Sequence, residues 1–265
     1  GNANIVGNVT AAFYYGDGRN LTNVEAELGT ATNISVAGFI NVGTDLSVSG
    51  TSNVIGAASF QATVTVVGAA TFKDDVSVSG NTRLLGTVTV GGAVSLASSL
   101  SVGGVANFAN TVTIAGAVSL ASTLSVGGAS NFASTVTIAG AVSLASTLSV
   151  GGASNFASTV TVVGAGTFKS DVSVSGNTRL LGTVTVGGAV SLASTLSVGG
   201  VANFANTVTI AGAVSLASTL SVGGASNFAS TVTVVGAAAF KSNVSVSGNV
   251  DIAGNVSVGG TLFAA

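Results

Sequence analysis

Residues 132–155 read FASTVTIAGAVSLASTLSVGGASN, and this phrase recurs with few changes along most of the chain. Its tripeptide Thr-Val-Thr begins at positions spaced by 24 residues, from Thr63 through to Thr231. Inside each 24-residue unit lies a period of six, because every sixth residue from Val36 to Val258 is Val, Ile, Leu or Phe. The sequence is therefore an internal repeat of hexads, with four hexads in each unit.

Each hexad predicts one short strand followed by one corner. The first and fifth residues of a hexad are apolar, and polar or small residues lie between them, as in residues 132–137, FASTVT. Such alternation predicts a strand over residues 135–138, with Val136 and Ile138 facing inward and Thr135 and Thr137 facing outward. The small pair that follows, residues 139–140, predicts the corner. A helix is excluded because six does not fit a repeat of 3.6 and because Gly and β-branched residues dominate.

The interior is predicted to be narrow and tightly filled. Wherever Phe occupies the first hexad position, the residue two positions earlier is Ala, Ser or Gly, where other hexads usually carry Val or Leu. A close-packed core needs a small residue beside each large ring. Both positions are therefore expected to face one interior. The Phe residues concerned are Phe60, Phe72, Phe108, Phe132, Phe156, Phe168, Phe204, Phe228 and Phe240.

Two constructions satisfy a six-residue period of strand and corner, and both are all-β triangular β-helices. In a single-chain β-solenoid, three hexads make a turn, and each turn stacks on the previous turn of the same chain at about 4.8 Å. In an intertwined homotrimer, each level takes one hexad from each of three chains, so the same hexads give a rod about three times as long. The absence of insertions suits a uniform shaft rather than a solenoid with loops and a cap. We therefore expect the homotrimer, with the single-chain coil as the alternative.

Several phrases resemble a known class of fibrous protein. Residues 14–24, YYGDGRNLTNV, are similar to a Gly-Asp/Asn-Gly-x-x-Leu-Thr motif of tail-fibre and other fibrous virion proteins of tailed phages, particularly phages of marine bacteria. The phrases VSVSGN, GTVTVGG and FKSDVSVSG resemble the shaft repeats of the same proteins. The resemblance implies a homotrimeric fibre on a virion, joined to other fibre or tail proteins. A host surface receptor would be bound through another segment.

The composition excludes several functional classes. Charged residues make up 5% of the chain, against about 25% in typical domains, and His and Cys are absent. Zinc and iron sites built from imidazole or thiolate are therefore excluded. Six basic residues and a net charge of −2 argue against nucleic-acid binding, and no apolar run reaches the length of a membrane span. The absence of Met indicates that these residues come from a longer polypeptide.

The charged residues form two small clusters, which are Lys73, Asp74, Asp75 and Arg83 in one place and Lys169, Asp171 and Arg179 in another. Paired carboxylates could serve glycoside hydrolysis or bind a cation. However, adjacent strand residues face opposite sides, and the second cluster has Ser170 in place of Asp74. A solvated polar collar with local Lys–Asp and Arg–Asp pairs is the preferred interpretation.

Two further patterns are interpreted as structure. Gly16-Asp17-Gly18 could hold a phosphate or a metal, but Asp-Gly after an aromatic run is ordinary hairpin chemistry. The ranked Thr-Val-Thr tripeptides could match an ice lattice if they shared a face. However, the repeat contains four hexads and a triangular turn contains three, so each tripeptide lies one face further round than the previous one. The tripeptides therefore spiral around the coil, and ice binding is disfavoured.

These observations predict a small β-rich junction or knob over residues 1–35 and a repetitive β-helical shaft over residues 36–265. No catalytic, cofactor-binding or metal-binding residue is expected, and no enzyme activity. The expected function is that of a rigid structural spacer in a phage tail fibre or whisker, located on the virion and used for host attachment. The alternative is a single-chain β-solenoid adhesin or surface filament of a bacterium, and a tailspike-like enzyme is disfavoured.

Overall fold

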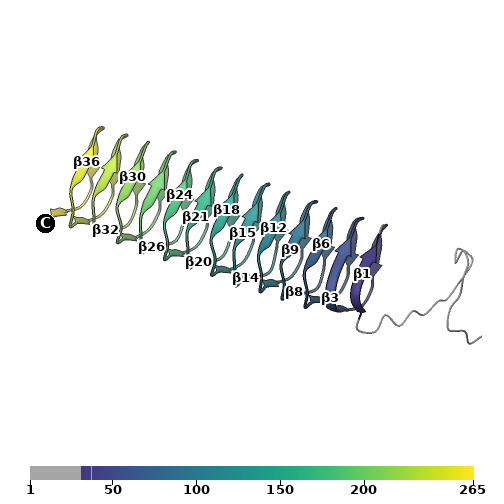
Figure 1. Ribbon diagram of the computed structural model, residues 1–265. Helices are drawn as coiled ribbons and strands as arrows, with labels where there is room; N and C mark the ends of the chain where they lie inside the picture. Colours follow the sequence, from purple (N-terminus) through teal and green to yellow (C-terminus); the bar gives the residue numbers. More distant parts are fainter. Residues whose placement is uncertain (1–30, 37) are drawn as a thin grey trace, which may run out of the picture.

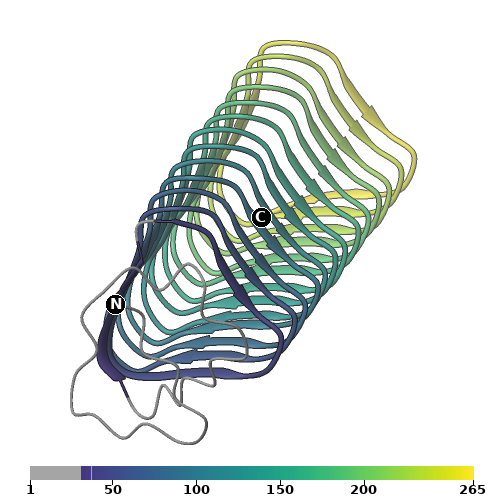
Figure 2. The ribbon, with the colours of Figure 1, turned by 90° about the vertical axis from the view of Figure 1, so that its right-hand side faces the viewer.

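A computed structural model describes residues 31–36 and 38–265 of the chain. These residues form an all-β, single-chain β-solenoid of about 12 turns, with about 18 residues in each turn. The turns stack in one direction, so that strands distant in sequence lie side by side along a rod (Figure 1). Seen obliquely along its axis, the chain winds in stacked turns whose flat sides are joined by corners (Figure 2).

Three faces of stacked parallel strands, which we call the first, second and third walls, run the length of the described coil. The first wall consists of β2 (Ile40–Val42), β4 (Ala58–Phe60), β7 (Val76–Val78), β10 (Val94–Leu96), β13 (Val112–Ile114), β16 (Ser130–Phe132), β19 (Leu148–Val150), β22 (Gly166–Phe168), β25 (Val184–Val186), β28 (Ala202–Phe204), β31 (Leu220–Val222), β34 (Ala238–Phe240) and β37 (Val256–Val258).

The second wall begins with residues 46–48 of the long strand β3 (Leu46–Val54). It continues with β5 (Val64–Val66), β8 (Thr82–Leu84), β11 (Leu100–Val102), β14 (Val118–Leu120), β17 (Val136–Ile138), β20 (Ser154–Phe156), β23 (Val172–Val174), β26 (Val190–Leu192), β29 (Val208–Ile210), β32 (Ser226–Phe228), β35 (Val244–Val246) and β38 (Leu262–Ala264).

The third wall begins with β1 (Ala31–Val36), which pairs with residues 51–54 of β3. Because β3 passes through a corner, it joins the second and third walls into one continuous sheet. The third wall continues with β6 (Ala70–Phe72), β9 (Val88–Val90), β12 (Ala106–Phe108), β15 (Leu124–Val126), β18 (Val142–Leu144), β21 (Val160–Val162), β24 (Thr178–Leu180), β27 (Leu196–Val198), β30 (Val214–Leu216), β33 (Val232–Val234) and β36 (Val250–Ile252).

The backbone ladder joins each residue to the residue 18 positions further along the same chain. Val136, for example, pairs with Val118 on one side and with Ser154 on the other. The hydrogen bonds continue through the corners, where Val136 N–H donates to the Ala153 carbonyl and Val118 N–H to the Thr135 carbonyl, each at 2.9 Å. The backbone groups of an inner strand are therefore satisfied on both sides within the chain.

This ladder bears on the expected construction of the shaft. The structure is that of the single-chain alternative, and it gives no support to the intertwined homotrimer. In the intertwined form, the level above each hexad would belong to another chain, but here the chain's own next turn occupies it. A period of six is common to both constructions, so the sequence pattern alone did not separate them.

The predicted inward and outward positions are confirmed. Phe132, Ile138 and Leu144 are at most 3% exposed, and they belong to one core that runs the length of the coil. The strands are one residue shorter than predicted, because Thr135 lies in the corner before β17 rather than in the strand. Residues 31–36, most of which were assigned to a junction segment, form β1 of the coil, while residues 1–30 lie outside the described residues.

The pairing of each Phe with a small residue is also confirmed as a packing feature. Ser130 and Phe132 of β16 are both buried, at 0% and 3% exposure. At Gly166, an added Cβ would lie 3.3 Å from the ring of Phe168 and 3.3 Å from the Leu180 side chain. The ring therefore folds back over the first residue of its own strand, and a large residue there would collide with it.

Glycine at the corners permits the close stacking of turns. An added Cβ on Gly140 would lie 2.3 Å from the carbonyl carbon of Ser122 in the preceding turn, which is closer than side chains tolerate. Corners containing Ser-Thr and corners containing Gly-Ala alternate from one hexad to the next, and one turn contains three hexads. Gly140 therefore stacks between Ser122 and Ser158. The 24-residue unit and the 18-residue turn thus place unlike corners next to each other along this edge.

Candidate functional surface

The outer face of each inner strand presents a single central side chain to solvent. Across the three walls these central residues are mostly Ser, Thr and Asn, as in the stack Ser119, Thr137, Asn155 and Ser173 on the second wall. Such side chains offer neutral hydrogen-bond donors and acceptors but no charge. The walls therefore form extended, flat and almost uncharged polar surfaces.

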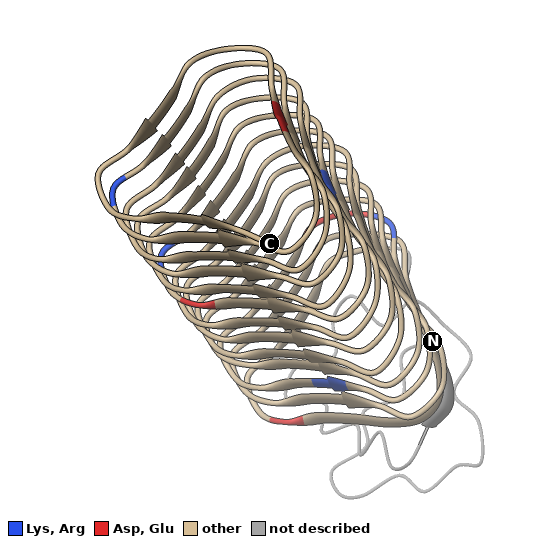
Figure 3. Ribbon diagram, turned by 90° about the vertical axis from the view of Figure 1, so that its left-hand side faces the viewer, with Lys and Arg blue, Asp and Glu red and all other residues tan. Residues whose placement is uncertain are grey.

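The predicted charged collar is dispersed rather than gathered in one place. Lys73, Asp74 and Asp75 occupy the corner between β6 and β7, whereas Arg83 is the central residue of β8 on the second wall. In the second cluster, Lys169 and Asp171 lie at the corner between β22 and β23, and Arg179 lies on the third wall. Charged residues accordingly appear at separate corners and walls along the rod (Figure 3).

The expected Lys–Asp and Arg–Asp pairs are replaced by contacts with the backbone. Asp75 Oδ1 accepts a hydrogen bond from Ala93 N–H at 2.7 Å, and Asp171 Oδ1 accepts one from Ala189 N–H at 2.7 Å. Both bonds reach from one turn to the next. A corner amide 18 residues away presents a fixed donor, whereas an ion pair on the surface must immobilise a long Lys or Arg side chain for little gain. The carboxylates therefore act as clamps between turns.

Asparagine side chains form similar clamps. Asn81 Oδ1 accepts hydrogen bonds from the hydroxyl groups of Ser98 and Ser99 in the next turn, at 2.6 and 2.8 Å. Asn110 Nδ2 donates to the Gly91 carbonyl of the preceding turn at 3.0 Å. These polar side chains are engaged in holding the coil together.

Sequence reasoning missed the clamps, although the signal was present. The Asp and Asn side chains whose Oδ1 accepts a hydrogen bond from the next turn all occupy the fourth position of a hexad, immediately before a strand. Elsewhere this position usually carries Thr or Ala. Knowing the 18-residue turn is necessary to recognise which amide lies above each side chain. The acceptors are Asp45, Asp75, Asn81, Asp171, Asn177 and Asn243.

The two carboxylates considered for catalysis have different roles. Asp75 is a clamp, and its counterpart in the second cluster, Asp171, makes the same bond. Asp74 is exposed and corresponds to Ser170, which has no carboxylate. The structure therefore does not repeat a pair of carboxylates between the two clusters, as a duplicated catalytic site would require.

The Thr-Val-Thr tripeptides spiral around the coil as expected. Thr137 is paired with Ser119 below and Asn155 above, so neighbouring turns on this wall do not present another such tripeptide. On the second wall the tripeptides begin at Thr63, Thr135 and Thr207, which are 72 residues or four turns apart. This spacing leaves no continuous threonine lattice.

Shallow grooves hollow the outer surface, and two of them have volumes of about 470 and 460 Å³. The first runs across four turns of the second wall beside the corner residues Ala121, Ala139 and Ala157. Its polar lining consists of Ser, Thr and Asn side chains, without a charged group. It can offer neutral hydrogen bonds to a ligand, but it contains no acid or base.

Within residues 31–36 and 38–265, no group of three or more His, Cys, Asp and Glu side chains is placed to hold a metal ion. The described part of the chain also contains no helix with the length and apolar character that a membrane crossing needs. Gly16-Asp17-Gly18 and the aromatic residues before it lie outside the described residues.

Comparison with known proteins does not assign a family. No protein-family model matches the sequence, and no curated protein and no solved structure is significantly similar to the chain.

Proposed function

We propose that this chain is a rigid structural spacer in an extracellular appendage, in the first instance the shaft of a phage tail fibre or whisker used for host attachment. The observation that carries this proposal is the unbroken register of the coil. From β4 to β38, every strand pairs with the strand three hexads away, and no loop interrupts the walls. A surface without inserted loops suits a role in which length and stiffness matter more than a binding cleft.

Several features support stiffness. Each added turn buries six inward side chains in the continuous core and extends three backbone ladders, so bending the rod would have to stretch the hydrogen-bond ladder on its convex side. The clamps formed by Asp75 and Asn81 add contacts between turns at the corners. The nearly uncharged exterior gives few groups for tight binding of charged ligands.

The virion as location, and other fibre or tail proteins as partners, are proposed from the resemblance of residues 14–24 and of the shaft phrases to phage fibre proteins. A second candidate is a single-chain β-solenoid adhesin or surface filament of a bacterium. The single-chain coil supports this candidate, because the phage resemblance implied a three-chain construction that such a coil does not need. Neither proposal includes a catalytic step.

Rod length tests the spacer role and the chain construction together. In a single-chain coil, duplicating residues 136–207 adds four turns and lengthens the rod by about 19 Å. In an intertwined trimer the same duplication adds about 58 Å. Electron microscopy of the two proteins measures the difference, and sedimentation measures mass, expected at 25.0 kDa for one chain. A mass near three times that value with the longer increment would restore the trimer.

Location is tested by an antibody against the described coil, applied to phage particles and to bacterial cells from the same source. Labelling along a tail appendage supports the first candidate, and labelling of the cell surface supports the second. Labelling of neither would contradict both. Incubation with host polysaccharide is a separate control, in which release of oligosaccharides would contradict the proposed absence of catalysis.

A further inference from the structure

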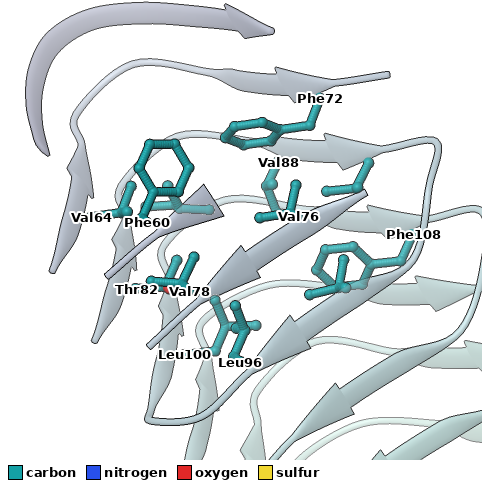
Figure 4. A pocket seen from close by; sticks show the side chains of 13 residues that line it. Phe60, Val64, Phe72, Val76, Val78, Thr82, Val88, Leu96, Leu100 and Phe108 are labelled. Carbon is teal, nitrogen blue, oxygen red and sulfur yellow. The ribbon is translucent and has the colours of Figure 1, made fainter. Parts of the chain in front are cut away.

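The core contains two small cavities that are copies of each other. The first lies inside three successive turns, among side chains from β4 to β12, and has a volume of about 20 Å³ (Figure 4). The second has the same volume and lies inside the turns from β20 to β28. Every residue that lines the second cavity is the residue 96 positions after a lining residue of the first, with the same identity. Two independent occurrences show that the cavity follows from the sequence of this segment.

The cavity exists because the middle turn has too little side-chain volume to fill its interior. All six inward residues of this turn line the cavity, and none is aromatic. The rings of Phe60, Phe72 and Phe108, in the turns before and after, border the space without filling it (Figure 4). The six residues are Val76, Val78, Thr82, Leu84, Val88 and Val90.

The core side chains with the largest remaining solvent exposure line the same two cavities. Val76 and Thr82 are 6% and 7% exposed, and their copies Val172 and Thr178 are 8% and 7% exposed, the largest values in the buried core. These side chains belong to the walls of the two cavities. Space large enough for a water-sized sphere therefore adjoins them.

The cavity wall does not suit water. A buried water needs two to four polar partners. The lining contains one polar side chain, Thr82, whose hydroxyl is buried and has no hydrogen-bond partner, and the same is true of Thr178 in the second cavity. The neighbouring backbone is engaged in the ladder, as in the bond from Thr82 N–H to the Ser99 carbonyl. A single hydroxyl cannot hold a water in this space.

We propose that each cavity is dry and is a binding site for one small nonpolar guest, such as a xenon atom or a hydrocarbon of similar size. The guest would gain dispersion contacts with the Val, Leu and Phe side chains that at present face empty space. Larger aromatic molecules would not fit so small a cavity. The proposal does not depend on the function of the rod.

Xenon is the probe for this proposal, applied under pressure to crystals of the whole chain. Two xenon sites per chain are expected, one in each cavity. Thr82→Leu should fill the first cavity and abolish only that site, because Leu100 occupies the equivalent place in the next turn. The second cavity is then an internal control. Thr178→Leu should give the reverse pattern, and Thr82→Val, which keeps the shape and removes the hydroxyl, should keep both sites.

Absence of xenon from both cavities of the folded wild-type chain would overturn the proposal, and so would ordered water in them. Persistence of the first site in Thr82→Leu would also overturn it. Thermal unfolding of each variant checks that the coil is intact. If Thr82→Leu does not fold, Val88→Leu fills the same cavity from the third wall and carries the same expectation.

Discussion

Residues 60–108 and 156–204 are two copies of one stretch, and corresponding residues of the two copies lie on different walls of the same rod. Their sequences differ at five positions, of which only Ala70, replaced by Gly166, faces the core. The copies are 96 residues apart, which is five turns and one hexad, so the second copy is rotated by one wall. Arg83 accordingly lies on the second wall and Arg179 on the third.

The interior is nevertheless the same in both copies. The cavity, the clamps at Asp75 and Asp171, and the hydrogen bonds that Asn81 and Asn177 accept all recur after the rotation. The three walls therefore provide equivalent environments for a hexad. The hexad, rather than the complete turn, is the unit that the sequence must preserve.

Deletions between the two copies should test this equivalence with the largest effect. Removing residues 136–147 deletes two hexads and rotates the second copy by two walls, but every inward residue remains inward. Removing residues 136–146 instead shifts the register by one residue and turns the core face of every later strand outward. We expect the twelve-residue deletion to unfold within a few degrees of wild type. The eleven-residue deletion should lose more than about 5 kcal/mol, or cooperative unfolding altogether.

Circular dichroism during thermal and urea unfolding measures both deletions. Equal damage from the two would show that the complete turn, and not the hexad, is the structural unit.

Corner glycines should be the next most sensitive positions, and equally so in both copies. An added Cβ on Gly92 would lie 2.3 Å from the Asp74 carbonyl carbon, and one on Gly188 would lie 2.3 Å from the Ser170 carbonyl carbon. Gly92→Ala and Gly188→Ala should each destabilise the coil by about 1–3 kcal/mol, because the added methyl group would clash with backbone atoms and with the clamp carboxylate of Asp75 or Asp171. Urea unfolding of both variants, with Ser170→Ala as the control, provides the measurement. A cost confined to one copy would contradict the equivalence of the corners.

Removing a clamp should cost less. Asp75→Ala and Asp171→Ala each leave a corner amide, at Ala93 or Ala189, without its side-chain acceptor, and we expect a loss of about 1 kcal/mol. Asp74→Ala is the matched control and should change little, since the second copy already carries Ser170 there. If Asp74→Ala proved as costly as Asp75→Ala, the clamp interpretation would be wrong.

A difference just outside the copies predicts a stabilising change. Ala58 lies two residues before Phe60, whereas Ser154 lies two residues before Phe156. The Ser154 hydroxyl is buried without a hydrogen-bond partner. Ser154→Ala should stabilise the coil by about 1 kcal/mol, because an unsatisfied polar group leaves the core. Ala58→Ser should destabilise it by a similar amount. Finding no change in either direction would mean that the hydroxyl has a partner.

The smallest effect is expected at the one core difference between the copies. Gly166→Ala recreates the first copy, in which Ala70 is 1% exposed beside Phe72. The added methyl group reduces the freedom of the unfolded chain, but it meets the Phe168 ring at 3.3 Å. We expect a net stabilisation of about 0.5 kcal/mol in thermal unfolding. A destabilisation would show that the two interiors differ more than their sequences suggest.

The sequence was sufficient to predict the strands, their inward faces and the offset of each Phe by a small neighbour, because these depend only on residues within one or two hexads. Features that join different turns were not predictable in the same way. The Asp75 clamp and the cavity beside Thr82 depend on which hexads lie in the same turn and which lie in neighbouring turns. Identifying those hexads requires the number of residues in a turn. A period of six fits both one chain with 18-residue turns and three chains that alternate, so the expected trimer was not supported.

The unequal lengths of the repeat and the turn have a consequence for how the rod meets its surroundings. Because 24 residues are one turn and one further hexad, each Thr-Val-Thr tripeptide lies on the wall next to that of the previous one. The tripeptides return to the same wall after 72 residues. A molecule that approaches the rod from any direction around its axis therefore meets nearly the same set of outward-facing side chains. Contacts along the shaft would therefore depend little on how the rod is rotated about its long axis.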